Sequence, residues 1–381
     1  GPRLIALAKD ELHTRLERRL GQMAHNDEIQ EEMLSLDVEQ QLEVFGRTIS
    51  PSDEEEVLAR TREFLNWRFA SAHEVIESAS WLRIDRIGMR MLNASALSGA
   101  ECVYLRLLIT GAGEKNVKFV MIDEVQDYTE TQLMVLGKYF SRAHFLLLGD
   151  SNQAIWEDTA TFEQIEKIFI ATHGEGAVST CKLLTSYRSS PEITALFTSL
   201  LSEEERGQTS SVQRGGKKPE FFEVVADNKD TERAEYLQTM KSLIEQAQEF
   251  DGLTAIVCTE KSRVRWLVKQ LEGVFAEGGN GVADGATDGV AGNDTAQAKL
   301  CTDVKVLTSH DSLPAKGVVL LDLALAKGLE FDQVIVADAQ EEVYKADGIS
   351  RRRLYTALSR AMHHVMVVSQ GKMTPLLSKL L

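Results

Sequence analysis

Two adjacent carboxylates, Asp123 and Glu124, end the apolar stretch FVMI, and a third acid, Asp127, follows closely. A buried strand that ends on adjacent acids places both at the carboxyl edge of a sheet, where open parallel sheets bind ligands. At phosphoryl-transfer sites one acid holds Mg²⁺, and its neighbour orients or deprotonates the attacking water. Acids also end many strands that bind nothing, so the pair alone is weak evidence. Asp127 receives no firmer role than a turn residue or a partner of the pair.

Four further segments place polar groups where apolar stretches end or helices begin. They are GDSNQAI, TSYRSSPEI, AKGLEFD and LYTALSRA, and they begin at residues 149, 185, 326 and 354. In the second segment Ser189, Pro191 and Glu192 predict a helix start, with Ser189 and Glu192 forming a capping box. Arg188 would then precede a helix N-terminus, a position suited to phosphate.

The elements that must position these segments form two regions. Residues 3–110 carry apolar residues at helical spacing, and Ser50 or Ser52 is the expected N-cap of one helix. After residue 115, short apolar stretches alternate with amphipathic helices, which predicts an α/β fold with a mostly parallel sheet flanked by helices. The predicted strands are 117–123, 144–150, 221–225, 254–258, 304–308, 317–325, 333–338 and 364–369. The glycine-rich stretch 278–293 is predicted to be a flexible surface loop.

Composition narrows the class of protein. The net charge of −16 argues against a broad basic face for nucleic acid, although it leaves room for a local groove. No apolar run approaches the roughly 18 residues of a transmembrane helix. The cysteines have no metal-type spacing, so they are expected to be reduced core thiols of a cytoplasmic protein; they are Cys102, Cys181, Cys258 and Cys301.

The ordered segments resemble the helicase motifs of the UvrD/Rep-like superfamily 1. IDEVQD resembles motif II, GDSNQAI motif III, YRS motif IV, KGLEFD motif V and YTALSRA motif VI, over roughly residues 116–370. The wording IDEVQDYTETQ, LAKGLEFD and LYTALSRAMH is most similar to the HelD-like (helicase IV-like) branch. Members of this branch include ATPases associated with RNA polymerase. The resemblance implies RecA-like P-loop NTPase helicase domains that use ATP and Mg²⁺.

The resemblance also implies a role for each matching residue. Asp123 would hold Mg²⁺, Glu124 would activate water, and Gln153 would sense the γ-phosphate. Tyr187 would stack on the base, while Gly328 and Glu330 would lie at the nucleotide, with Glu330 on the ribose. Arg188 would reach the γ-phosphate, and Arg360 would be the arginine finger.

The sequence departs from the family pattern at three places. It contains no phosphate loop of the form G-x-x-x-x-G-K-[ST], and in GAGEKN Glu114 stands where lysine is needed. Together with Gly1-Pro2, typical of a protease scar, this suggests an engineered fragment of a longer protein, inactive as an ATPase by itself. At the usual position of a base-stacking Trp stands Asp158, while Trp156 occupies the slot of a Tyr. Ala324 replaces a polar residue of motif V.

Three domains are expected: a helical arm at 1–115, the tail of a first RecA-like domain at 116–180, and a second RecA-like domain at 181–381. The predicted function is the C-terminal part of an ATP-dependent DNA helicase-like motor. The alternative is a factor that binds and recycles RNA polymerase and uses ATP as a conformational switch. A degenerate interaction module that binds no nucleotide is the third reading. Expected partners are DNA, RNA polymerase or both, without a membrane, and the arm is expected to contact a protein.

Overall fold

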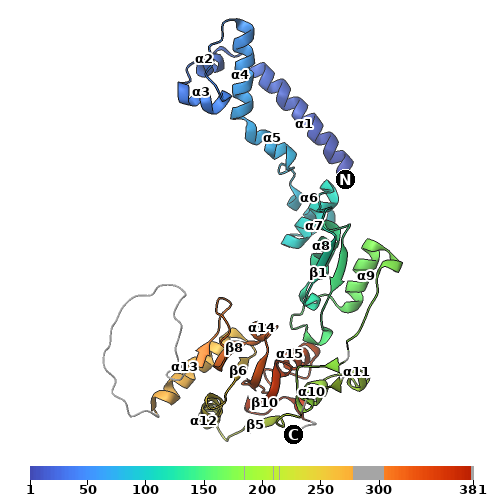
Figure 1. The fold of residues 1–381 in the computed structure, drawn as a ribbon, viewed down its shortest axis with the longest axis vertical. Coiled ribbons are helices and arrows are strands. Elements are labelled where there is room, and N and C mark those ends of the chain that lie inside the picture. The colour runs from blue at the N-terminus through green and yellow to red at the C-terminus, as the bar shows by residue number, and fades with distance from the viewer. Residues whose placement is uncertain (184, 209, 214, 278–303, 379–381) are drawn as a thin grey trace. The chain divides into compact units, whose positions relative to one another are not determined.

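The structure is a computed structural model that describes residues 1–183, 185–208, 210–213, 215–277 and 304–378 (Figure 1). The chain packs as two compact units. The first comprises residues 1–121, 129–146 and 163–178, and the second comprises residues 122–128, 147–162 and 179–381. These units divide the chain by packing, and the three predicted domains stay a prediction.

The N-terminal region is helical, as predicted. Its helices are α1 (Pro2–Met23), α2 (Asp27–Leu34), α3 (Val38–Phe45), α4 (Glu54–Arg68), α5 (Ala70–Glu77), α6 (Ile84–Leu92) and α7 (Gly99–Thr110). Side-chain caps explain several starts, because Asp37 and Ser98 each form a complete capping box. The predicted N-cap of α4 is wrong: Asp53 accepts from the Glu56 N–H, while Ser52 binds the Glu56 carboxylate.

A small sheet pairs β1 (Phe119–Ile122) with β2 (His144–Leu147), joined by α8 (Glu130–Tyr139). One face packs on α9 (Phe162–His173), where the rings of Phe145 and Phe169 lie 4.9 Å apart. On the opposite face the side chains of Phe119 and Met121 are 79% and 70% exposed. The turns after the two strands contain the short helices η1 (Val125–Asp127) and η2 (Ser151–Gln153).

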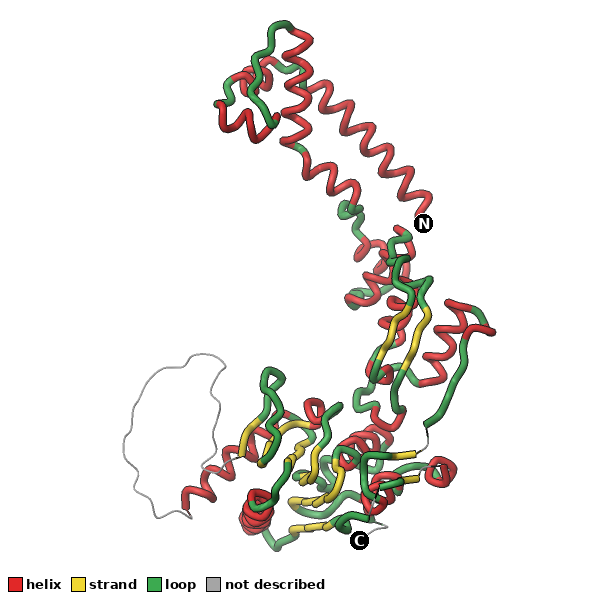
Figure 2. Tube along the Cα trace, viewed as in Figure 1, coloured by secondary structure: helices red, strands yellow, loops and turns green. Residues whose placement is uncertain are grey.

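The second unit is built on a large parallel sheet in the order β5-β10-β9-β6-β8-β7. The strands are β5 (Glu220–Val224), β6 (Leu253–Cys258), β7 (Val304–Val306), β8 (Gly317–Asp322), β9 (Phe331–Val336) and β10 (Ala361–Gln370). Alternate residues of each strand face two cores. One core joins the sheet to α12 (Lys229–Gln248) and α13 (Lys261–Glu277), and the other joins it to α10 (Pro191–Thr198) and α15 (Gly348–Leu358). Figure 2 shows the strands in yellow between red helices.

The predicted α/β class with an N-terminal helical region is confirmed, and every predicted strand is present. The arrangement is consistent with a RecA-like helicase fold. The remaining described elements are η3 (Glu175–Ala177), α11 (Glu203–Gln208), η4 (Pro375–Leu377) and the paired two-residue strands β3 (Thr185–Ser186) and β4 (Ser210–Ser211).

Three further local predictions are wrong. The strand expected at 317–325 ends at Asp322, because the Asp322 side chain accepts from the Leu325 N–H and starts the short helix α14 (Leu323–Ala326). Ser190, not Ser189, caps α10, since Ser189 donates its hydroxyl to the Ala361 carbonyl at 2.7 Å. Cys181 is exposed, not in the core.

Two predictions fall outside the described residues, namely the loop 278–293 and the environment of Cys301. Within the described part of the chain, no helix combines the length and the apolar character needed to cross a bilayer.

Candidate functional site

The acidic pair lies in a sharp turn after β1. Glu124 has φ 51° and ψ 44°, in the left-handed region that costs a non-glycine residue about 1–2 kcal/mol. Its N–H donates to Asp123 Oδ1 at 2.9 Å, and the Asp123 side chain is exposed. Backbone strain of this kind persists where the surroundings impose it, often at functional sites. The turn thus separates the two carboxylates, with the Asp123 side chain exposed and the Glu124 side chain only partly exposed.

The buried side chain of Gln126 holds Glu124 through a hydrogen bond. Gln126 donates its amide N–H to Glu124 Oε2, and its Oε1 accepts the Asp150 N–H at 3.0 Å. A Cβ at residue 149 would lie 2.2 Å from Gln126 Oε1, so any residue other than glycine there would displace the Gln126 amide. The amide therefore ties the turn after β1 to the turn after β2.

Residues of the turn after β2 continue this series of hydrogen bonds. Asp150 caps η2 through the Asn152 N–H and accepts from Gln153 Nε2 at 2.9 Å. Gln153 Oε1 in turn accepts from Arg360 Nη2 at 2.6 Å. The Asp150 carboxylate can only accept and the Arg360 guanidinium can only donate. These two partners therefore fix the orientation of the Gln153 amide.

Arg360 is 2% exposed, and among the described residues no carboxylate lies within hydrogen-bond distance of its guanidinium group. Its remaining N–H groups donate to the carbonyls of Thr356 and Leu329 and to the Ser359 hydroxyl. Burial, and then the charge of Arg188, lower the pKa of Arg360 to about 10. A buried cation held by neutral acceptors beside a second cation is electrostatically suited to an anion.

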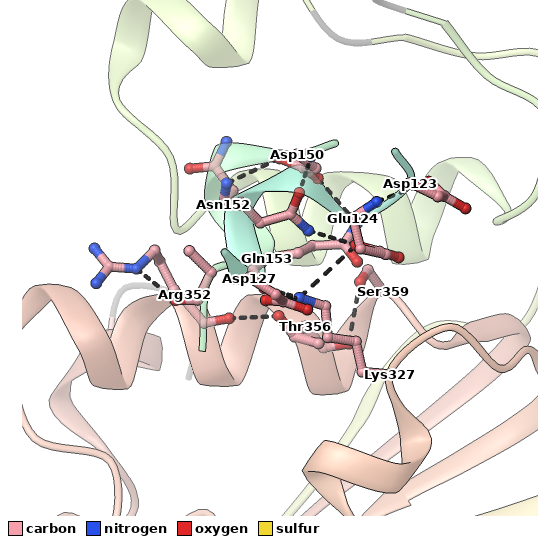
Figure 3. Close-up of polar contacts among 12 residues, drawn as sticks. Asp123, Glu124, Asp127, Asp150, Asn152, Gln153, Lys327, Arg352, Thr356 and Ser359 are labelled. Carbon is pink, nitrogen blue, oxygen red and sulfur yellow. Dashed lines mark hydrogen bonds and ion pairs between the residues drawn. The ribbon is translucent and has the colours of Figure 1, made fainter. Parts of the chain in front are cut away.

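Lys327 reaches the acidic turn from the loop after α14. Its ammonium lies 2.5 Å from Asp127 Oδ1, 2.8 Å from the Gln153 carbonyl oxygen and 3.7 Å from Glu124 Oε2. Figure 3 shows these groups converging from three separate parts of the sequence.

Of the other predicted residues, Gly328 and Glu330 follow Lys327 in this loop, and Arg188 contacts Glu330. Arg188 forms an ion pair with Glu330, Nη2 to Oε1 at 2.5 Å, and both side chains are about half exposed. Gly328 has φ 80°, which any other residue would adopt only with strain. Tyr187 presents an exposed ring, and its carbonyl accepts from Gln213 Nε2.

Two arginines of α15 bind backbone rather than solvent or acids. Arg352 Nε donates to the Ala154 carbonyl at 2.8 Å, and Arg353 Nε donates to the Ile155 carbonyl at 3.2 Å. Arg351, which precedes them in α15, is exposed. The turn that carries Gln153 is thereby fastened to the helix that leads to Arg360.

The structure links Glu124, Gln153 and Arg360 in one polar network and pairs Arg188 with Glu330, while Asp123 and Tyr187 stand apart with exposed side chains. Sequence reasoning missed three members, namely Gln126, Asp150 and Lys327. Each lies inside a quoted motif, so the motifs themselves were the available signal.

The residues fit a magnesium-bound polyphosphate. Asp123 is exposed, and the only hydrogen bond that it accepts among the described residues comes from the N–H of Glu124, which leaves carboxylate oxygen of the kind that Mg²⁺ prefers. Arg188 and Arg360 are close enough for one charge to depress the pKa of the other. An anion at these guanidinium groups would offset their repulsion.

Comparison with known proteins identifies two segments. Residues 106–168 match the family described as UvrD/REP helicase N-terminal domain, and residues 317–368 match the family described as UvrD-like helicase C-terminal domain. The first segment contains Glu124 and Gln153, and the second contains Lys327 and Arg360. The resemblance to UvrD-like helicases is therefore confirmed at the level of these domains. The HelD-like branch stays a prediction, because neither description names it.

A solved structure described as the C-terminal domain of a possible DNA helicase from Lactobacillus plantarum WCFS1 is also similar. It shares 28% sequence identity, the match covers 51% of this chain and 94% of that chain, and the TM-score is 0.33. No curated protein matches the chain.

Proposed function

We propose that this chain supplies the acidic and arginine side of an ATP-hydrolysing site in a motor of the superfamily 1 DNA helicase type. The observation that carries the proposal is the continuous polar path from Glu124 through Gln126, Asp150 and Gln153 to Arg360. Phosphoryl transfer needs a positioned water and positive charge at the transferred group, and the two ends of this path provide them.

The residues divide the work by position. Asp123 would hold Mg²⁺, which when bound neutralises charge on the phosphates. Glu124 would accept a proton from the attacking water. Gln153, Arg188 and Arg360 would contact the transferred phosphoryl group, where their donors stabilise the developing charge. Tyr187, Gly328 and Glu330 would bind the base and the sugar.

The phosphate loop must come from another segment, because none of the 381 residues forms G-x-x-x-x-G-K-[ST]. The proposal therefore predicts no ATP turnover by this chain alone. It predicts turnover by a polypeptide in which a phosphate-loop segment precedes this chain, measured as phosphate release. Glu124→Gln should abolish that turnover, and Glu63→Gln, at an exposed carboxylate that pairs with Arg60, is the matched control. Turnover that survives Glu124→Gln contradicts the assignment.

A second candidate function is a HelD-type factor that binds RNA polymerase and uses ATP as a conformational switch. Two observations favour it. Asp158 is exposed where a base-stacking residue is usual, and its charge repels phosphate. The arm also exposes apolar side chains on α2 and α3, namely Leu34, Val38 and Leu42.

One pair of measurements separates the two functions. Unwinding of duplex DNA by the loop-containing polypeptide supports the motor. Co-purification with RNA polymerase without unwinding supports the switch, and Val38→Glu with Leu42→Glu should then abolish the co-purification.

A further inference from the structure

Lys327 is a buried cation with an unusual set of partners. Its side chain is 7% exposed, so the ammonium depends on protein groups for its hydrogen bonds. Two short contacts go to Asp127 Oδ1 and the Gln153 carbonyl, and the Glu124 carboxylate lies at ion-pair distance. One ammonium thus touches both turns that carry predicted catalytic groups.

The backbone of Lys327 is fixed by the end of α14. Its N–H donates to the Leu323 carbonyl at 3.0 Å, and the extended backbone at Lys327 ends α14. The adjoining Ala326 and the first helical residue Leu323 are buried in the core between the large sheet and α15. The Cα of Lys327 is therefore held by buried neighbours, unlike that of a lysine on a surface loop.

The contacts at Glu124 are unequal between its two oxygens. Gln126 Nε2 donates to Oε2, and Lys327 approaches the same Oε2. Among the described residues no hydrogen bond reaches Oε1, and the side chain is 37% exposed. Protein groups therefore hold Oε2 of Glu124, while Oε1 accepts no hydrogen bond from the described residues.

We propose that Lys327 is a positioning residue that, together with Gln126, fixes Oε2 of Glu124 so that Oε1 faces the attacking water. The inference rests on the proposed function and deepens it. Asp127, which the sequence left without a firm role, anchors the ammonium. Lys327 also donates to the Gln153 carbonyl. It therefore fixes the position of Glu124 relative to the turn that carries Gln153.

The rival explanation is a structural latch in which Lys327 and Asp127 merely hold two turns together. A latch predicts that any ion pair between positions 127 and 327 is sufficient. Positioning predicts that the ammonium must come from position 327, since only there does it reach Glu124 and Gln153 from its present side.

The first test uses this chain with ¹⁵N-labelled glutamine side chains. The Nε2 resonance of Gln126 is identified by its loss in Gln126→Leu. Lys327→Met should shift that resonance, because Glu124 Oε2 loses one of its two partners. The control is Lys316→Met, whose side chain is 64% exposed and pairs with Asp251 at the surface, and it should leave the resonance unchanged. If Lys327→Met does not fold, Lys327→Arg keeps the charge but changes the donor geometry and should also shift the resonance. An unmoved Gln126 signal in a folded Lys327 variant overturns the proposal.

The second test uses the polypeptide with the phosphate loop. Lys327→Met should lower kcat about 100-fold, the scale expected from a misplacement of about 1 Å, and leave KM for ATP nearly unchanged. The exchange of Asp127→Lys with Lys327→Asp should recover thermal stability but not kcat. Recovery of kcat by the exchange would show a latch and overturn the proposal. If the unsubstituted polypeptide has no turnover, the proposed function fails, and the Gln126 resonance still decides whether Lys327 holds Glu124.

Discussion

Strand β1 of the small β1–β2 sheet and strand β9 of the large sheet are followed by aspartates that lie in opposite environments. In the small sheet FVMI is followed by Asp123, and in the large sheet VIVA is followed by Asp338. Asp123 is exposed, whereas Asp338 is 1% exposed and accepts the Thr259 N–H at 2.9 Å. The large sheet has helices on both faces, and the small sheet leaves one face bare. Burial by neighbouring elements, not local sequence, decides what an aspartate after a strand can do.

The largest expected effect comes from removing apolar volume from the large sheet. Ile256 in β6 is fully buried against α12 and α13. Ile256→Ala should lower the free energy of unfolding by about 2–5 kcal/mol, through lost transfer energy and the cavity left behind. Denaturant unfolding measures the loss, with Ile256→Val as the graded control at about 0.5–1.5 kcal/mol. A cost below that of the valine variant would mean that the core around β6 can collapse freely.

The next effect concerns the two aspartates and depends on pH. Burial raises the pKa of Asp338 from 3.8 to about 6, so the folded state binds a proton more tightly than the unfolded state. Stability from this group is present below pH 4 and is lost as pH rises to about 6. Asp338→Asn cannot ionise and should be more stable than wild type at pH 8, by about 2–3 kcal/mol, and nearly equal to it at pH 4.

Unfolding at the two pH values checks this, and Asp123→Asn supplies the matched comparison. Asp123 is exposed, so its substitution should change stability little. A pH-independent gain for Asp338→Asn would contradict the role of burial.

The contrast also shows what sequence could predict. Apolar stretches such as LTAIVC and GVVLLD are strands because a parallel strand buried on both faces is continuously apolar. Motif order predicted Gln153 and Arg360, which the structure joins across 207 positions of sequence. The contact between Lys327 and Asp127 was not predictable, because it spans 200 positions of sequence and depends on where α14 ends. Ser190 rather than Ser189 caps α10, because the Ser189 hydroxyl donates to the Ala361 carbonyl. This is a tertiary contact that no local sequence pattern encodes.

The smallest expected effect lies on the bare face of the small sheet. Met121 is 70% exposed, so Met121→Thr removes almost no buried surface and places a β-branched residue in a strand. The free energy of unfolding should stay within about 0.5 kcal/mol of wild type. Met240→Thr in α12, at a fully buried position, is the matched control and should destabilise strongly because it buries a hydroxyl and leaves a cavity. If Met121→Thr cost as much as Met240→Thr, the face would be covered in solution, and the contrast between the two sheets would not hold.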